Sequence, residues 1–126
     1  MTLHTLSSGS QGNCLLLSDG GTHILVDAGI STRRIKAGLA RLGLSMDDLD
    51  GILITHEHTD HISGLATLIK HHTVPLYASP GTARQLAYRL AGVEPLLRPR
   101  DPGTEFCIGS CRVTAFATSH DAAQSM

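Results

Sequence analysis

Near the N-terminus, apolar residues recur in short runs that Gly-rich segments separate. Residues 3–6, 14–17 and 23–26 have the length and composition of β-strands. The sequence Asp19-Gly20-Gly21 predicts a hairpin turn between the second and third of these strands. Residues 8–13 predict a flexible turn, which either offers backbone N–H groups to a phosphate or simply connects two strands.

Helical spacing of apolar residues then begins. A first helix is expected to start at Ser31 or Thr32 and to stop at Gly43. Its buried face comprises Ile35, Leu39 and Leu42. A second helix follows residue 61 and carries one apolar stripe of Ile62, Leu65, Leu68 and Ile69. A third opens at 79–81, where Pro80 is tolerated in the first turn, and carries Ala83, Leu86, Ala87 and Leu90.

Further strands lie between and after these helices. Residues 51–55 form a continuous apolar run, which is typical of a strand buried on both faces. Residues 74–78, 105–108 and 112–117 are expected to be strands, the last two joined by a turn at Gly109-Ser110. The predicted order is strands first, then strands that alternate with helices, then strands again. This order predicts an α/β layered fold with a mixed sheet.

Composition narrows the class of protein. The 126 residues are 41% hydrophobic and 17% charged, which suits one globular domain. The net charge of −1 provides no global attraction for nucleic acid or an anionic membrane, although it leaves a local basic patch open. No signal peptide is recognisable and no apolar run reaches the roughly 18 residues that a membrane span needs, so we expect a cytoplasmic protein without a membrane partner.

The three cysteines, Cys14, Cys107 and Cys111, form no CxxC pair. We expect free or buried thiols rather than disulfides, and we favour this over a role in metal binding.

Candidate chemistry is concentrated directly after the apolar run 51–55. His56, His58, Asp60 and His61 offer imidazole nitrogens and a carboxylate, which are ligands of Zn²⁺ and Mn²⁺ in hydrolytic sites. Ligands in α/β sheets bind outside the carboxyl ends of strands, where this string lies. His56 and His58 can point to one metal, and Asp60 and His61 to a second. A solvated polar loop is the alternative, and the strand before and amphipathic helix after the string argue against it.

The other histidines have ordinary explanations. His71 and His72 come at the end of the second helix, where polar and cationic side chains are common. His4 and His23 fall within predicted strands.

These motifs resemble those of the metallo-β-lactamase fold superfamily. The H-x-H-x-D-H string at 56–61 resembles its signature, residues 24–29 resemble its preceding strand-and-aspartate motif, and residues 118–120 resemble its strand-end histidine. Residues 6–14 and 119–122 narrow the resemblance to the WalJ/YycJ group of bacterial cytoplasmic hydrolases, whose members are associated with DNA exonuclease activity.

The resemblance implies site roles. His56, His58 and His120 would hold the first of two divalent ions, Zn²⁺ or Mn²⁺, and Asp60 and His61 would contribute to the second. Asp60 would also be catalytic, by orienting the attacking water or accepting its proton. Asp27 would orient a ligand histidine; from the residues alone, a simple turn aspartate is an equal alternative. Asp121 is either a similar supporting group or a loop residue.

The resemblance also implies a fold larger than this chain. The family's domain is an αββα sandwich about twice as long, with a bridging aspartate and a further histidine after the motif that contains His120. Residues 1–126 would therefore supply about the N-terminal half, a mixed sheet with helices on one face, truncated after the third metal-ligand motif. The chain would be a fragment or incomplete, or copies of it would associate as a homo-oligomer through an exposed apolar sheet face.

Three hypotheses for function follow. The first is a metal-dependent phosphodiesterase or exonuclease acting on DNA. The second is a hydrolase of a small ester, thioester or lactam on the same site. The third is an inactive metal-binding fragment.

Overall fold

A computed structural model describes residues 1–8, 12–55 and 62–114 of the chain. Within these ranges, no helix is both long enough and apolar enough to cross a membrane. The elements, in chain order, are β1 (Thr2–Ser7), β2 (Cys14–Asp19), β3 (Thr22–Val26), α1 (Thr32–Arg41), the 3₁₀ turn η1 (Met46–Asp48), β4 (Gly51–Leu53), α3 (Leu65–His71), β5 (Leu76–Ala78), α4 (Pro80–Arg89), the 3₁₀ turn η2 (Glu94–Leu96), β6 (Leu97–Pro99), β7 (Glu105–Ile108) and β8 (Cys111–Thr114).

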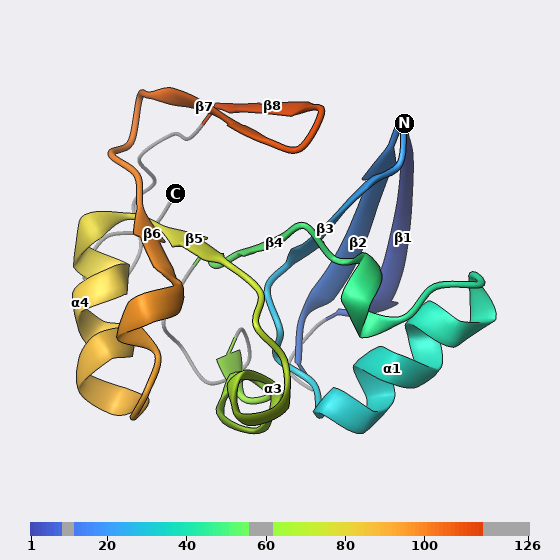
Figure 1. Ribbon diagram of the computed structural model, residues 1–126, viewed down its shortest axis with the longest axis horizontal. Coiled ribbons are helices and arrows are strands. Elements are labelled where there is room, and N and C mark those ends of the chain that lie inside the picture. Colours follow the sequence, from blue (N-terminus) through green and yellow to red (C-terminus); the bar gives the residue numbers. More distant parts are fainter. Residues whose placement is uncertain (9–11, 56–61, 115–126) are drawn as a thin grey trace.

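The first six strands form one mixed sheet in the order β1-β2-β3-β4-β5-β6. The pairs β1/β2 and β2/β3 are antiparallel, and each later pair is parallel. A parallel pair needs a crossover connection, which α1, α3 and α4 provide in turn. All three helices lie on the same face of the sheet (Figure 1). The predicted mixed sheet with helices on one face is confirmed.

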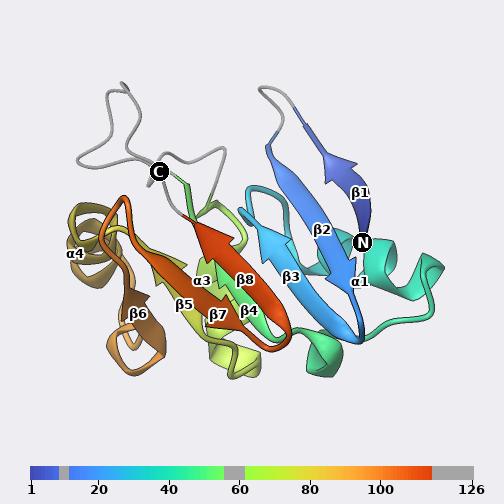
Figure 2. The same cartoon turned by 90° about the horizontal axis from the view of Figure 1, so that it is seen from above.

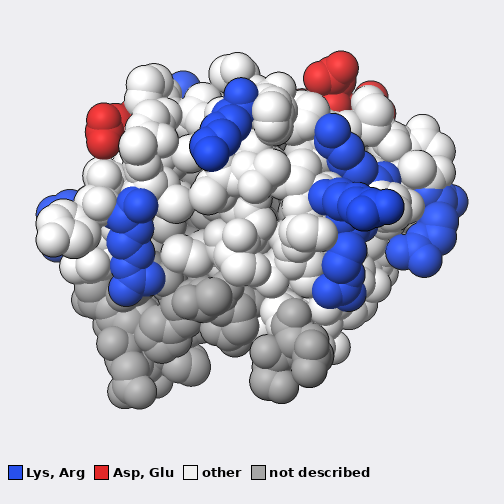
Figure 3. Space-filling view, turned by 90° about the horizontal axis from the view of Figure 1, so that it is seen from below, with Lys and Arg blue, Asp and Glu red and all other residues white. Residues whose placement is uncertain are grey.

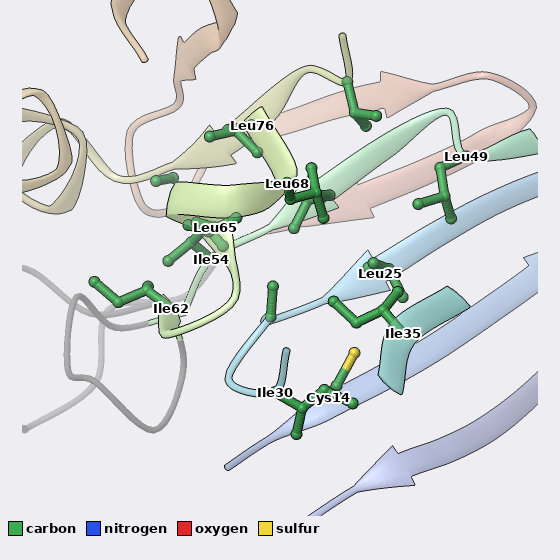
Figure 4. Packing of buried hydrophobic residues seen from close by; sticks show 14 of the residues in the cluster. Cys14, Leu25, Ile30, Ile35, Leu49, Ile54, Ile62, Leu65, Leu68 and Leu76 are labelled. Carbon is green, nitrogen blue, oxygen red and sulfur yellow. The ribbon is translucent and has the colours of Figure 1, made fainter. Parts of the chain in front are cut away.

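The main core fills the space between the sheet and this helical layer. Leu25, Ile52 and Leu76, from neighbouring strands, are fully buried there against Ile35 and Leu68 of the helices (Figure 4). Burying each such side chain stabilises the fold by roughly 1.5–3 kcal/mol. The small number of aromatic residues is therefore compensated by closely packed aliphatic side chains.

The first helix begins and ends as its sequence predicts. Ser31 is the N-cap, and its hydroxyl accepts a hydrogen bond of 3.2 Å from the Arg34 N–H. Of the three residues predicted to be buried, Ile35 and Leu39 are, but Leu42 is 38% exposed. The prediction for Leu42 is wrong because the helix ends at Arg41, so Leu42 becomes the C-cap and leaves the apolar stripe.

One strand was not predicted. β6 consists of Leu97, Arg98 and Pro99 and pairs in parallel with β5. Proline and a charged residue hide the strand signal, yet both are tolerated because β6 lies at the edge of the sheet.

The β7–β8 hairpin forms a separate two-stranded sheet on the face opposite the helices (Figure 1). Ile108 and Cys111 of the hairpin are buried against Ile24 of β3. Where the hairpin turns, the Ser110 N–H donates a hydrogen bond of 2.8 Å to the Thr22 hydroxyl. The predicted strand 112–117 is thus confirmed as far as Thr114, and residues 115–117 lie outside the described ranges.

Candidate metal centre

Three strands end at the same edge of the molecule. β3 ends at Val26 and β4 at Leu53, β8 is described as far as Thr114, and these three residues line one groove of about 500 Å³ between the main sheet and the hairpin. Figure 2 shows β8 running over the sheet in the same direction as β3. The segments that follow these strands in the sequence contain Asp27, the string at 56–61, and His120. The described ends of these strands, which precede the three predicted site segments in the sequence, therefore lie at one edge.

The structure describes one of the predicted site residues, Asp27. The five predicted metal ligands, His56, His58, Asp60, His61 and His120, lie outside the described ranges. In the part of the chain that is described, no cluster of three or more His, Cys, Asp or Glu side chains could hold a metal ion.

The Asp27 carboxylate holds Thr55, the residue that precedes His56. Asp27 is only 5% exposed. Its Oδ1 accepts a hydrogen bond of 2.8 Å from the Thr55 N–H, and its Oδ2 accepts one of 2.7 Å from the Thr55 hydroxyl. Hydrogen bonds to a carboxylate are stronger than those between neutral groups. This buried acid therefore fixes the point at which the histidine string leaves β4.

The backbone of Asp27 is left-handed, with φ of 64°. Such a conformation costs a non-glycine residue roughly 1–2 kcal/mol, and Asp is among the residues that adopt it most readily. Hydrogen bonds hold the turn on both sides: the Asp27 N–H donates to the Leu53 carbonyl at 2.7 Å, and the Gly29 N–H to the Asn13 carbonyl at 2.8 Å. The turn is thus tied to β4 and to the loop that precedes β2.

The segment after the histidine string packs against the same turn. The Gly64 N–H donates to the Ala28 carbonyl at 2.8 Å, and the Ser63 hydroxyl donates to the Gly29 carbonyl at 2.5 Å. A Cβ atom on Gly64 would collide with the carbonyl oxygen of Ile30. Two backbones therefore approach so closely at this point that only glycine fits.

Gly12 makes a second close approach. It is buried, and a Cβ atom there would collide with the carbonyl oxygen of Gly29. Its own carbonyl accepts a hydrogen bond of 2.9 Å from the Ser7 hydroxyl. Gly12 is therefore held against the turn after β3; residues 9–11 of the predicted turn lie outside the described ranges.

Both ends of the histidine string are anchored in the core. Ile54 precedes it and Ile62 follows it, and both side chains belong to the main apolar cluster (Figure 4). The described residues on either side of the string are therefore fixed by burial in the core.

Cys14 lies beneath this scaffold as a free, buried thiol. Its pKa is raised to about 12, first by burial and then by the negative charge of Asp27. A thiol with this pKa stays protonated at neutral pH, and metals bind the thiolate. Cys14 is therefore a packing residue, as expected.

Thr55, Ser63 and Gly64 were not predicted as supporting residues. Thr55 and Ser63 carry no signal that sets them apart from other hydroxyl residues. Gly64 does carry one, since it falls inside the predicted second helix, where a glycine is unfavourable and often has a packing reason.

Comparison with known proteins finds a matching family and several relatives of this chain. A family model described as the metallo-beta-lactamase superfamily matches residues 8–118. Exodeoxyribonuclease YycJ of Bacillus anthracis is 36% identical and covers 100% of this chain, which spans 49% of that relative. Exodeoxyribonuclease WalJ of Streptococcus pneumoniae is 38% identical over 93% of this chain and 45% of its own length. Ribonuclease Z of Methanopyrus kandleri is 30% identical over 84% of this chain and 39% of its own length.

Solved structures share the fold. The Rm3 metallo-beta-lactamase superposes with a TM-score of 0.78 and 28% identity, covering 98% of this chain and 51% of that one. The chain thus spans about half the length of the curated relatives and solved structures that it matches.

Proposed function

Because the chain belongs to the metallo-beta-lactamase superfamily, we propose that it forms the metal-binding part of a hydrolase that cleaves phosphodiester bonds of DNA. One observation carries this proposal: the whole chain aligns with a relative named as an exodeoxyribonuclease. The geometry supports it, because the strands that lead to Asp27, to the histidine string and towards His120 end at one edge.

The family implies divalent metal ions, and the donors in this sequence fit them. His56, His58 and His120 would hold the first ion, and Asp60 and His61 would contribute to a second. Imidazole and carboxylate donors suit Zn²⁺ or Mn²⁺. When bound, such ions stabilise negative charge on the attacking and leaving oxygens and lower the pKa of water.

The side chains of the chain perform the remaining tasks. A carboxylate oxygen of Asp60 orients the attacking water or accepts its proton. Asp27 holds Thr55, and through it the start of the string that contains His56 and His58. Ile54 and Ile62, which flank the string in the sequence, are buried in the main core. Asp27 and Thr55 position the reaction rather than take part in it.

Residues 1–126 would make up a partial domain whose site is completed by further ligands. These come from chain beyond these residues or from a second copy, which would cover the groove lined by Leu17, Leu53 and Val113.

The first test is digestion of labelled DNA by the purified protein with added divalent metal. We expect Asp60→Asn to lower kcat by several orders of magnitude with a much smaller change in KM, because the substitution keeps the shape of the side chain but removes its charge. His71→Ala, on an exposed residue of α3, is the matched control and should be nearly silent.

Several outcomes would redirect the assignment. Cleavage that resists a chelator would reject the metal mechanism. Hydrolysis of a lactam, ester or thioester with DNA left intact would favour the second candidate, to which the similarity with the Rm3 enzyme points. RNA cleaved in preference to DNA would favour a ribonuclease, in line with the similarity to ribonuclease Z. Metal binding without hydrolysis of any of these substrates would favour the third hypothesis, an inactive metal-binding fragment.

A further inference from the structure

Charge is divided very unevenly between the helices and the remainder of the chain. The described helices α1, α3 and α4 contain seven of the ten Lys and Arg residues and none of the eleven Asp and Glu residues. The rest of the chain has three basic against eleven acidic residues, a net charge of −8. The net charge of −1 for the whole chain therefore conceals a strongly cationic layer.

These seven cations lie on one open surface. We call this surface the basic helical face; all of its members are exposed, and they are Arg33, Arg34, Lys36 and Arg41 of α1, Lys70 of α3, and Arg84 and Arg89 of α4. Figure 3 shows Lys and Arg side chains spread across this side of the molecule, with Asp and Glu confined to its upper margin in that view. Among the described residues, no ion pair involves Arg33, Arg34 or Lys36.

Helix stability does not account for the cations at the start of α1. Arg33 and Arg34 lie in the first turn of α1, which contains no acidic residue. Cations at a helix N-terminus are unfavourable by roughly 0.3–1 kcal/mol, because the helix dipole is positive there. None of the described helices α1, α3 and α4 contains an acid that could form an i,i+4 pair with one of these cations. Arg41, Lys70 and Arg89 lie in the last turns of their helices, where the dipole favours cations. Arg33 and Arg34 have no such benefit and weaken the start of α1, which argues for an external anionic partner there.

One aromatic side chain lies within the basic helical face. Tyr88 of α4 is 90% exposed, next to Arg89 and one helical turn from Arg84. Exposed aromatic rings between cations are the stacking platforms on which single-stranded nucleic acids place their bases. A lipid surface would instead require a broad apolar stripe beside the cations, and the helices turn their apolar residues to the core.

We propose that the basic helical face binds the phosphate backbone of a single nucleic-acid strand, with a base stacked on Tyr88. Five of the seven cations are arginines, whose planar guanidinium groups suit phosphate. Their spread over three helices fits an extended polyanion rather than a small anion. α1 begins five residues after Asp27, which places one end of the basic helical face close to the candidate metal centre. A nucleic-acid strand bound to this face therefore borders that centre. The identity of the strand as DNA rests on the proposed function.

The test measures binding separately from cleavage. A fluorescent single-stranded DNA oligonucleotide is titrated with the purified protein in chelator, and anisotropy is recorded at several salt concentrations. We expect Arg33→Gln with Arg34→Gln to weaken binding roughly tenfold at moderate salt and to reduce the slope of log K against log salt by roughly 1.4, since each phosphate contact on a single strand contributes about 0.7. Tyr88→Ala should reduce affinity for the single strand more than for a duplex.

The matched control removes the same charge from outside the helices. Arg98→Gln with Arg112→Gln should change the affinity less than twofold, and thermal unfolding establishes that both variants are folded. An equal loss of affinity in the two double variants would mean that only the net charge of the protein matters, and it would overturn the proposal. Affinity unchanged in Arg33→Gln with Arg34→Gln would also overturn it, as would binding to phosphatidylserine vesicles but not to DNA.

Cleavage assays with added metal keep this inference apart from the proposed function. DNA that is bound through the basic helical face but never cleaved would overturn the proposed function alone. DNA that is cleaved while the helix variants keep their affinity would overturn this inference alone.

Discussion

Among single residues, Asp27 does most to organise the candidate metal centre, and it gives the sharpest test. Its two carboxylate oxygens accept from the Thr55 N–H and hydroxyl. In Asp27→Asn, the amide nitrogen cannot accept a hydrogen bond from the hydroxyl. We expect roughly 10–100-fold weaker binding of Zn²⁺ or Mn²⁺, the usual cost of losing a group that supports metal ligands. Competition with a colorimetric chelator measures the affinity.

The control for this prediction is Asp47→Asn, which removes the same charge from an exposed position in η1. It should leave metal affinity within twofold of the original. Equal metal affinity in Asp27→Asn and the unsubstituted protein would show that Asp27 is only a turn residue.

The amino-acid sequence identifies candidate metal ligands more readily than it identifies the residues that hold those ligands in place. The string from His56 to His61 can be recognised as a metal-binding motif, because few other roles explain three imidazoles and a carboxylate after a buried strand. Asp27 alone is ambiguous, because an aspartate before Ala28 and Gly29 equally suits an ordinary turn. Its left-handed backbone and its bonds to Thr55 depend on β4 lying beside β3, which no local pattern encodes.

At the scale of elements, the close approach of Gly64 to the turn after β3 should be intolerant of any side chain. Gly64→Ala places a Cβ atom against the Ile30 carbonyl, and backbone on both sides leaves little room for relaxation. We expect a loss of about 3 kcal/mol in the free energy of unfolding, at the upper end of the range for overpacked sites. Urea denaturation measures it.

Thr67→Ala, on an exposed position of α3, is the companion substitution. It should change stability by less than about 0.5 kcal/mol. A Gly64→Ala protein as stable as this control would mean that α3 can shift away from the turn.

Element boundaries follow from the sequence where capping and periodicity agree. Ser31 and Ser79 cap α1 and α4 with their hydroxyls, as their positions before apolar stripes predict. β6 escapes prediction because its pairing with β5, rather than the propensity of Arg98 or Pro99, makes it a strand.

For the whole molecule, the groove between the main sheet and the hairpin has a consequence for assembly. Leu17, Leu53 and Val113 line it and are only half-buried. We expect residues 1–126 to self-associate, so the sedimentation coefficient should rise with concentration. Val113→Lys should reduce this association, whereas Leu42→Asp, on the helical side, should not. A single monomeric species at every concentration would contradict the prediction.

The hairpin that forms one wall of this groove also bears on biosynthesis. The hydrogen bond between Thr22 and Ser110 joins residues 88 apart, whereas those between Asp27 and Thr55 join residues 28 apart. Ribosomes add roughly 5–20 residues per second, and N-terminal segments emerge first. Asp27, Thr55 and Gly64 can therefore come together while β7 and β8 are still being translated, so the support for the metal ligands is ready before the hairpin closes over β3.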